Sequence, residues 1–146
     1  MALNRKLVLQ RPYISSTPIL KVTFIVRDNS GLGHDFTEDF MVDTGFNGGL
    51  KLSKNYIRIL ERLGIEGIDS VALLADGTRV LTSIFDAEIA EISSITNYRL
   101  SPPVPTKLSC FGLPPFLIGR QFLDKWIAEF DGPKQVLSLL SYDINR

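Results

Sequence analysis

The sequence predicts a mostly β fold, most simply a small closed barrel with one to two short helices. Three observations support this prediction. β-Branched and aromatic residues gather in short runs, which is typical of strands. Turn-forming clusters, such as residues 27–31 and Asp131-Gly132, separate these runs. Only one segment has a convincing helical spacing of apolar residues. We interpret residues 1–146 as one domain, because this length suits a single core.

The first two clear strands lead to an unusually placed acidic residue. Residues 19–26 are predicted as a strand that ends at the turn cluster 27–31, and residues 36–43 are predicted as the next one. The end of this second strand, Phe40-Met41-Val42, is apolar on both faces. A carboxylate directly after a buried strand, as at Asp43, is therefore the first indication of chemistry.

The middle of the chain predicts a helix followed by a hairpin. We expect a helix over residues 53–63, with Ser53 as its N-cap and Gly64 ending it. Asp76-Gly77 lies between two apolar runs within residues 71–82 and predicts a hairpin turn. A further strand is expected over residues 84–92.

Prolines dominate the next segment. Residues 101–115 contain five prolines and are predicted to form an irregular loop. Residues 116–118 form a short apolar strand that ends at Gly119, and a helical turn is expected at residues 121–126. Two strands follow, at residues 127–131 and 135–140, with Asp131-Gly132 as the turn between them.

Composition argues against several classes of function. Sixteen basic and sixteen acidic residues cancel, so we expect neither nucleic acid nor an anionic membrane as a partner. No apolar run is long enough for a membrane helix, and the first ten residues lack a secretory pattern. The single cysteine, Cys110, fits a reducing cytoplasm. The only histidine, His34, has no metal ligands at suitable spacing, so we expect no metal and no cofactor.

Three segments together resemble a known family. Residues 40–50 read FMVDTGFNGGL and resemble the active-site loop of the retropepsin-like (clan AA) aspartic proteases. The hairpin at Asp76-Gly77 corresponds to the flap that closes over substrate in that family. Residues 116–123 read FLIGRQFL and resemble the apolar-apolar-Gly-Arg segment near the C-terminus of retroviral proteases. The likeness spans roughly residues 19–139 and implies the acid-protease barrel.

The resemblance implies an aspartic endopeptidase that acts as a homodimer. Its reaction needs a water molecule between two carboxylates that share one proton. This chain has a single Asp-Thr-Gly triplet, so the second carboxylate must be the Asp43 of another copy, related by a two-fold axis. The ionised carboxylate takes a proton from the attacking water, and the protonated one assists the oxyanion and then the leaving amine. The implied substrate is an extended peptide or an unfolded protein.

The resemblance also assigns roles to further residues, and they fall into four groups. The catalytic loop is Asp43, Thr44 and Gly45, in which Thr44 holds the two loops together across the axis and Gly45 admits the substrate backbone. The expected substrate-binding residues are Asn47, Ala75, Asp76, Gly77 and Ile118, with further pocket residues at Leu52, Leu74 and Val80. Gly119 and Arg120 give structural support, Arg120 by donating a hydrogen bond to Asn47. The apolar segments 7–9 and 136–140 are candidates for the dimer base, or equally for internal strands.

This chain departs from the viral enzymes at two points. The hairpin tip, Ala75-Asp76-Gly77-Thr78, is less rich in glycine than a retroviral flap. The segment 50–68 carries the predicted helix and is longer than its viral counterpart. It resembles a group of prokaryotic retropepsin-like proteins whose loop reads Asp-Thr-Gly-Phe-x-Gly before a helix.

Other readings of the same residues stay open. The Asp43 triplet fits an ordinary turn at a strand end, the Asp76-Gly77 pair fits any hairpin, and Arg120 fits an ordinary surface position. The main alternative function is a non-catalytic peptide-binding or dimerisation module on the same fold. A structural subunit is a third reading, because a fold does not determine a function. A carboxylate kept at the end of a buried strand favours the enzyme.

Overall fold

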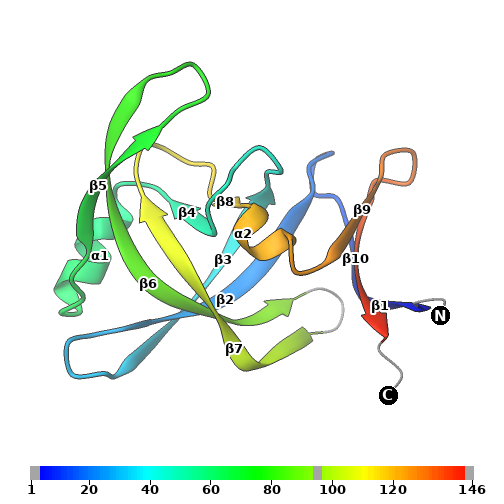
Figure 1. Ribbon diagram of the computed structural model, residues 1–146, viewed down its shortest axis with the longest axis horizontal. Helices are drawn as coiled ribbons and strands as arrows, with labels where there is room; N and C mark the ends of the chain where they lie inside the picture. Colours follow the sequence, from blue (N-terminus) through cyan, green and yellow to red (C-terminus); the bar gives the residue numbers. More distant parts are fainter. Residues whose placement is uncertain (1–3, 94–96, 144–146) are drawn as a thin grey trace.

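The computed structural model describes residues 4–93 and 97–143, and most of this part of the chain is β-structure (Figure 1). The mostly β prediction is confirmed. The strands are β1 (Asn4–Pro12), β2 (Ile19–Arg27), β3 (Gly33–Val42), β4 (Leu50–Leu52), β5 (Ile68–Leu73), β6 (Arg79–Ser93), β7 (Asn97–Cys110), β8 (Leu117–Ile118), β9 (Ile127–Asp131) and β10 (Val136–Asp143). The helices are α1 (Tyr56–Arg62) and α2 (Arg120–Leu123). Neither helix is long and apolar enough to cross a membrane.

The larger sheet curls into a nearly closed ring. Its strands follow the order β2-β3-β8-β4-β7-β6-β5, and β6 also pairs with β2. The pairs β3–β8 and β4–β7 are parallel, whereas β8 and β4 run antiparallel to each other. Strand β5 pairs with β6 alone and extends the sheet outside the ring. This topology brings the ends of β3 and β8 side by side, although about 75 residues of chain separate them.

The core fills the inside of the ring. Strand β2 shows why, because its apolar residues alternate: Leu20, Val22, Phe24 and Val26 are buried. The ring of Phe24 stacks on that of Phe36 with centroids 5.4 Å apart, and further aromatic contacts continue the cluster. This chain of aromatic contacts runs through Phe40, Tyr56 and Phe116. Helix α1 is thereby fixed to the ring through Tyr56, whose hydroxyl also donates to the Glu38 carboxylate at 2.7 Å.

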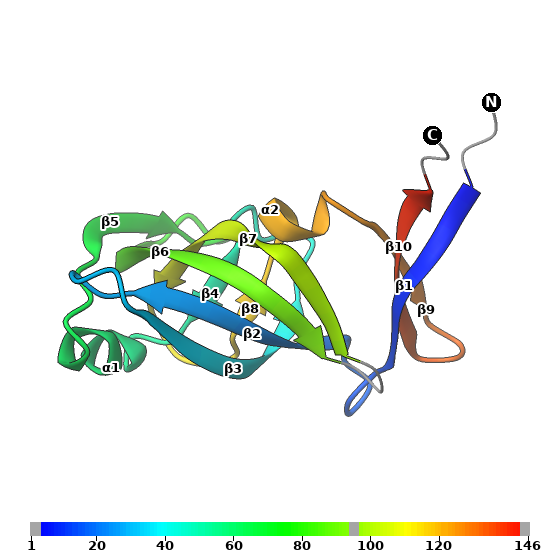
Figure 2. The same cartoon turned by 90° about the horizontal axis from the view of Figure 1, so that it is seen from below.

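A smaller three-stranded sheet lies at the end of the molecule opposite α1 (Figure 2). Strand β10 is its centre, with β1 and β9 on either side, and all pairs are antiparallel. The predicted segments 7–9 and 136–140 therefore pair with each other within one chain. Strands β1 and β9 each have one edge without a partner strand in the described part of the chain.

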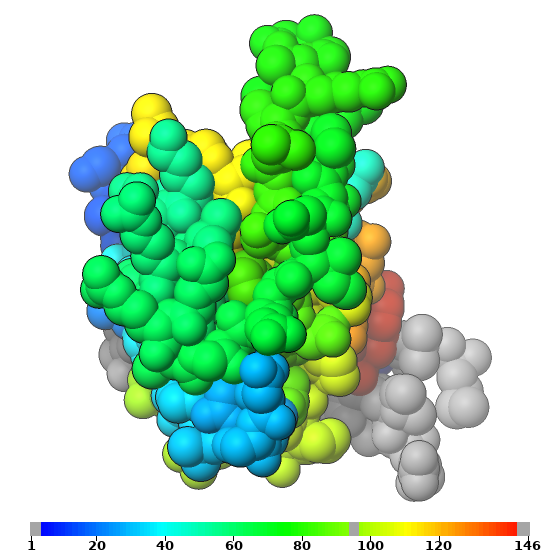
Figure 3. Space-filling model, turned by 90° about the vertical axis from the view of Figure 1, so that its left-hand side faces the viewer, coloured from blue at the N-terminus to red at the C-terminus, as the bar shows by residue number. Residues whose placement is uncertain are grey.

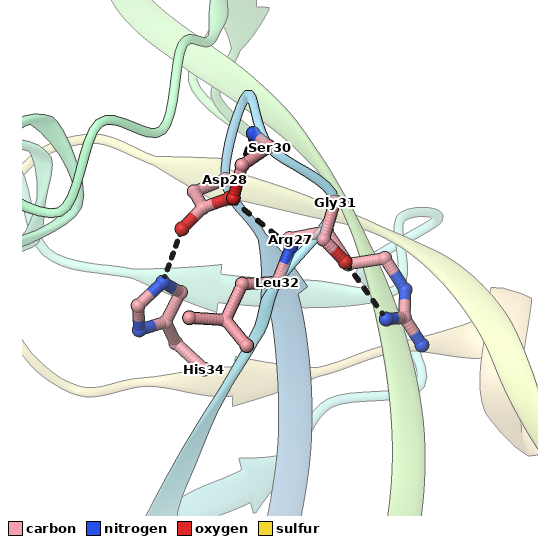
Figure 4. Close-up of polar contacts among 6 residues, drawn as sticks. All are labelled: Arg27, Asp28, Ser30, Gly31, Leu32 and His34. Carbon is pink, nitrogen blue, oxygen red and sulfur yellow. Dashed lines mark hydrogen bonds and ion pairs between the residues drawn. The ribbon is translucent and has the colours of Figure 1, made fainter.

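The turn between β2 and β3 is organised by one carboxylate (Figure 4). Asp28 accepts hydrogen bonds from the backbone and hydroxyl of Ser30, from the backbone of Leu32 and from His34 Nε2 at 2.8 Å. The hydrogen bonds from Ser30 and His34 hold the pKa of Asp28 well below its ordinary value. His34 is thus the partner of a turn carboxylate at the start of β3.

Helix α1 is shorter than predicted, and the prediction of Ser53 as its N-cap is wrong. The helix begins at Tyr56 with Asn55 at the N-cap, and no side chain caps it. Ser53 is buried, and residues 53–55 form a turn in which its carbonyl accepts the Tyr56 N–H at 3.1 Å. Gly64 ends the helix as predicted, with φ of +75°, a conformation that costs glycine little.

The predicted loop over residues 101–115 is also wrong in its first two-thirds. Strand β7 continues through Pro102, Pro103 and Pro105 to Cys110. Proline removes a backbone N–H, which matters only where that N–H would join a ladder. Strand β4 pairs with β7 from Leu108 to Cys110, beyond these prolines, so β7 has a free edge where they lie. The irregular part is confined to residues 111–116.

One long strand replaces two predicted ones after the hairpin turn. The segments predicted as the hairpin's second arm and as a separate strand at 84–92 together form the 15-residue β6. The turn itself lies where predicted: Gly77 has φ of +86°, and its N–H donates to the Leu74 carbonyl at 2.9 Å. The tip of this hairpin projects beyond the rest of the molecule (Figures 1 and 3).

Candidate functional site

Asp43 lies at the end of β3, where the ring opens toward the hairpin. Its backbone N–H donates to the carbonyl of Ile118 in β8 at 3.0 Å, which continues the parallel pairing by one step. Its side-chain Oδ1 accepts the Gly45 N–H at 2.9 Å, and its carbonyl accepts the Phe46 N–H at 3.2 Å. The carboxylate is half-buried, whereas Thr44 and Gly45 are exposed. A tight, internally bonded turn thus holds a partly accessible carboxylate.

Gly119 and Arg120, which follow β8, are hydrogen-bonded to the loop that begins at Asp43. The Gly119 N–H donates to the Gly49 carbonyl at 2.9 Å, and the Arg120 N–H donates to the Phe46 carbonyl at 2.8 Å. The Arg120 guanidinium also donates to the Asn47 side-chain oxygen. The predicted contact between Arg120 and Asn47 is therefore confirmed.

Position 119 needs glycine because there is no room for a side chain, and not because of its backbone conformation. A Cβ atom at this position would lie 2.4 Å from the Phe46 carbonyl oxygen and 2.5 Å from that of Gly48. Its φ of −114° is open to any residue. Two of the three segments that carry the resemblance, residues 40–50 and 116–123, are therefore packed directly against each other, backbone to backbone.

A cleft of about 500 Å³ separates the Asp43 loop from the β5–β6 hairpin. Its floor includes Asp43, Gly45 and Asn47, and its roof includes Leu74 and Ala75 near the hairpin tip. Asp76 and Gly77 form the exposed tip itself. Hydrogen bonds from Thr78 to Asp76 rigidify this turn and lower the pKa of the Asp76 carboxyl. An open volume of this size is within the range of ligand-binding clefts.

Three predicted pocket residues lie away from this cleft. Leu52 and Ile118 are fully buried in the core, and Val80 is half-buried in β6 but is not among the lining residues. Leu117, the neighbour of Ile118, lines the cleft instead. The reason is the strand period of two: Ile118 faces the inside of the ring, so Leu117 faces the opposite side.

Sequence reasoning missed Lys51, the one cation among the described residues that line the cleft. Only 5% of its surface is exposed, which is rare for lysine. Its Nζ donates to the carbonyl oxygens of Leu113 at 2.6 Å and Pro115 at 3.1 Å. The signal available in the sequence was a lysine between Leu50 and Leu52, in a stretch otherwise apolar.

A second cavity, of about 550 Å³, lies on another face of the ring, over parts of β2, β6 and β7. Its charged side chains include two ion pairs, Arg27 with Glu88 at 2.9 Å and Lys107 with Asp86. Exposed ion pairs such as these contribute little energy and indicate no particular chemistry. We take the cleft at Asp43 as the candidate site because it contains the carboxylate that the sequence singles out.

The comparisons with known proteins leave the family open. No protein-family model matches the chain, and no curated protein matches it. No group of three or more His, Cys, Asp or Glu side chains within residues 4–93 and 97–143 is arranged to hold a metal ion.

Proposed function

We propose that this chain is one half of a homodimeric aspartic endopeptidase of the retropepsin-like type, in which Asp43 is the catalytic carboxylate. The observation that carries the proposal is the position of Asp43: a half-buried carboxylate on the floor of a cleft, beneath a projecting hairpin. The contact between its loop and the Gly119-Arg120 segment supports it as well. A carboxylate that acts as general base on water must be held in position and remain accessible, and the half-buried Asp43, bonded to the Gly45 N–H, fits both requirements.

The proposed reaction uses one Asp43 from each subunit. The two carboxylates share one proton, because two nearby negative charges repel each other. The ionised one accepts a proton from water as the water oxygen bonds to the peptide carbonyl carbon. The other donates its proton to the carbonyl oxygen, and a proton then passes to the leaving amine as the C–N bond breaks. Exposed Thr44 and Gly45, next to Asp43, are available for the contact between subunits that this requires.

An extended peptide fits the cleft as the substrate. Strand β5 has a free edge in the described part of the chain, and its residues Val71, Ala72 and Leu73 line the cleft. A peptide lying there could pair with the hairpin as an added strand, while its side chains enter the apolar parts of the cleft. The lone thiol of Cys110 is fully buried and unpaired, which fits a protein that works in the cytoplasm.

The test is hydrolysis of unfolded casein by the wild type, by Asp43→Asn and by the control Asp124→Asn, between acidic and neutral pH. Asp124 is an exposed carboxylate outside the cleft lining, so its variant should keep full activity. We expect Asp43→Asn to lose at least about a thousandfold in kcat, because the base of the reaction is gone. Sedimentation in the same buffer should show a dimer.

Two outcomes would change the conclusion. Equal cleavage by wild type and Asp43→Asn would overturn the assignment of Asp43. A dimer that binds unfolded peptide without cleaving it at any pH would favour the peptide-binding module. That alternative uses the same cleft.

A further inference from the structure

The ammonium group of Lys51 is held rigidly within the candidate cleft. Two carbonyl oxygens, those of Leu113 and Pro115, accept two of its three N–H groups. Its Nζ also lies 5.1 Å from the centroid of the Phe111 ring, within the range of a cation–π contact. These contacts fix the charge against the irregular segment 111–116.

Strand register explains why Lys51 reaches the cleft. Lys51 is directly opposite Leu117 in β8 and Ser109 in β7, and Ser109 is opposite Ile84 in β6. Residues that face each other across paired strands share one side of a sheet. All four line the cleft, so this row forms part of its floor. On the other side of β4, Leu50 and Leu52 are fully buried in the core.

The charge of Lys51 is only partly compensated. Among the described residues that line the cleft, Asp43 and Lys51 are the two charged ones. The partners of Lys51 are neutral carbonyls, and burial lowers the pKa of its ammonium. One N–H remains after its two hydrogen bonds to described residues. A peptide that covers the cleft would remove the remaining contact with water, and an unpaired buried charge is costly.

We propose that Lys51 is a specificity-determining residue of this cleft, and that its ammonium binds a carboxylate of the peptide. The proposal rests on the proposed function in one respect, that a peptide occupies this cleft. A carboxylate supplies the missing negative charge and accepts a charge-assisted hydrogen bond from the third N–H. A neutral side chain at the same position leaves the ammonium without its counter-charge. The carboxylate belongs either to an Asp or Glu side chain or to the peptide C-terminus.

Binding to the Asp43→Asn variant tests this without any need for cleavage. The probes are fluorescent decapeptides of alanine and leucine, amidated at the C-terminus, with one glutamate or one glutamine at each position in turn. We expect at least about tenfold tighter binding, by anisotropy, for glutamate at one position. A glutamine peptide with a free C-terminus identifies the alternative source of the carboxylate.

The dependence on Lys51 is then measured directly. Adding Lys51→Met should abolish the preference, whereas Lys54→Met, at an exposed lysine three residues away, should preserve it. The preference should also disappear below about pH 4, where the glutamate is protonated. This last measurement shows that the carboxylate must be ionised. The comparison of glutamate and glutamine peptides uses a protein with Lys51 intact, so equal binding overturns the inference even if Lys51→Met does not fold.

Equal binding of every glutamate and glutamine pair, and of amidated and free peptides, would overturn the inference. A preference that survives in folded Lys51→Met would do the same. These results are distinct from those of the casein assay. A wild type that hydrolyses casein without any preference for carboxylates refutes the role of Lys51 alone. If the protein prefers peptides with a carboxylate but never hydrolyses casein, the proposed protease activity is refuted and the role of Lys51 is not.

Discussion

Replacement of Gly119 by alanine tests whether the Asp43 loop depends on close backbone packing. The added Cβ would lie 2.4 Å from the Phe46 carbonyl oxygen and 2.5 Å from that of Gly48, and neither backbone atom can rotate away. The two segments must separate. Their hydrogen bonds, from the Arg120 N–H to Phe46 at 2.8 Å and from the Gln121 N–H to Gly48 at 3.2 Å, then lengthen.

The expected loss of stability has two contributions. Overpacking of a well-packed site costs about 1–3 kcal/mol. Weakening two backbone hydrogen bonds costs up to about 1 kcal/mol each. We therefore expect Gly119→Ala to lower the free energy of unfolding by about 3 kcal/mol. In a domain of this size that lowers Tm by about 10 °C.

Urea denaturation followed by tryptophan fluorescence measures this change, and Gly132→Ala is the matched control. A Cβ at Gly132 meets no atom within 4 Å and needs no left-handed backbone, so this variant should stay within about 0.5 kcal/mol of the wild type. A Gly119→Ala protein as stable as Gly132→Ala would refute the packing argument. Casein hydrolysis should fall in Gly119→Ala even below its melting temperature, because the Asp43 loop is displaced.

Two further predictions concern titratable groups. The lowered pKa of Asp28 gives stability that is complete above its ordinary value of 3.8 and is lost as pH falls through the lower folded value. Asp28→Asn should therefore lower Tm at neutral pH and show a smaller loss of Tm between about pH 4 and pH 2; an identical acid profile would contradict this. Burial raises the pKa of the Cys110 thiol to about 12, so a disulfide reagent at about pH 8 should modify it only after unfolding. Rapid, stoichiometric labelling of the native protein would refute that expectation.

Local signals in the sequence were sufficient for much of the fold. The alternating apolar residues of β2, the glycine that ends α1 and the turn at Asp76-Gly77 all lie where the chain predicts them. Each depends on a few neighbouring residues, so the pattern can be read locally. The position of Asp43 directly after a buried strand was predictable for the same reason.

The rest depends on contacts between distant segments. Proline content indicated a loop at residues 101–115, but whether a missing N–H matters depends on which edge of β7 is paired. Strand β4 has three residues and leaves too short a pattern to recognise. The place of Lys51 in the cleft requires its register with Leu117 and Ser109, and neither partner is near it in sequence. Nothing in the sequence indicated that the carbonyl oxygens of Leu113 and Pro115 accept hydrogen bonds from the Lys51 ammonium.

Strand β6 has a mechanical consequence for the hairpin. One continuous strand forms an arm of the hairpin, then pairs with β7, and finally closes the ring against β2. Because no loop interrupts β6, the hairpin is joined to the ring by one continuous strand. Both of its ladders, with β7 and with β2, are irregular at one place on β6, between Ile89 and Glu91, and we expect β6 to bend there when the tip is displaced. We therefore expect an occupant of the cleft that displaces the hairpin to perturb the pairing of β6 with β2 as well.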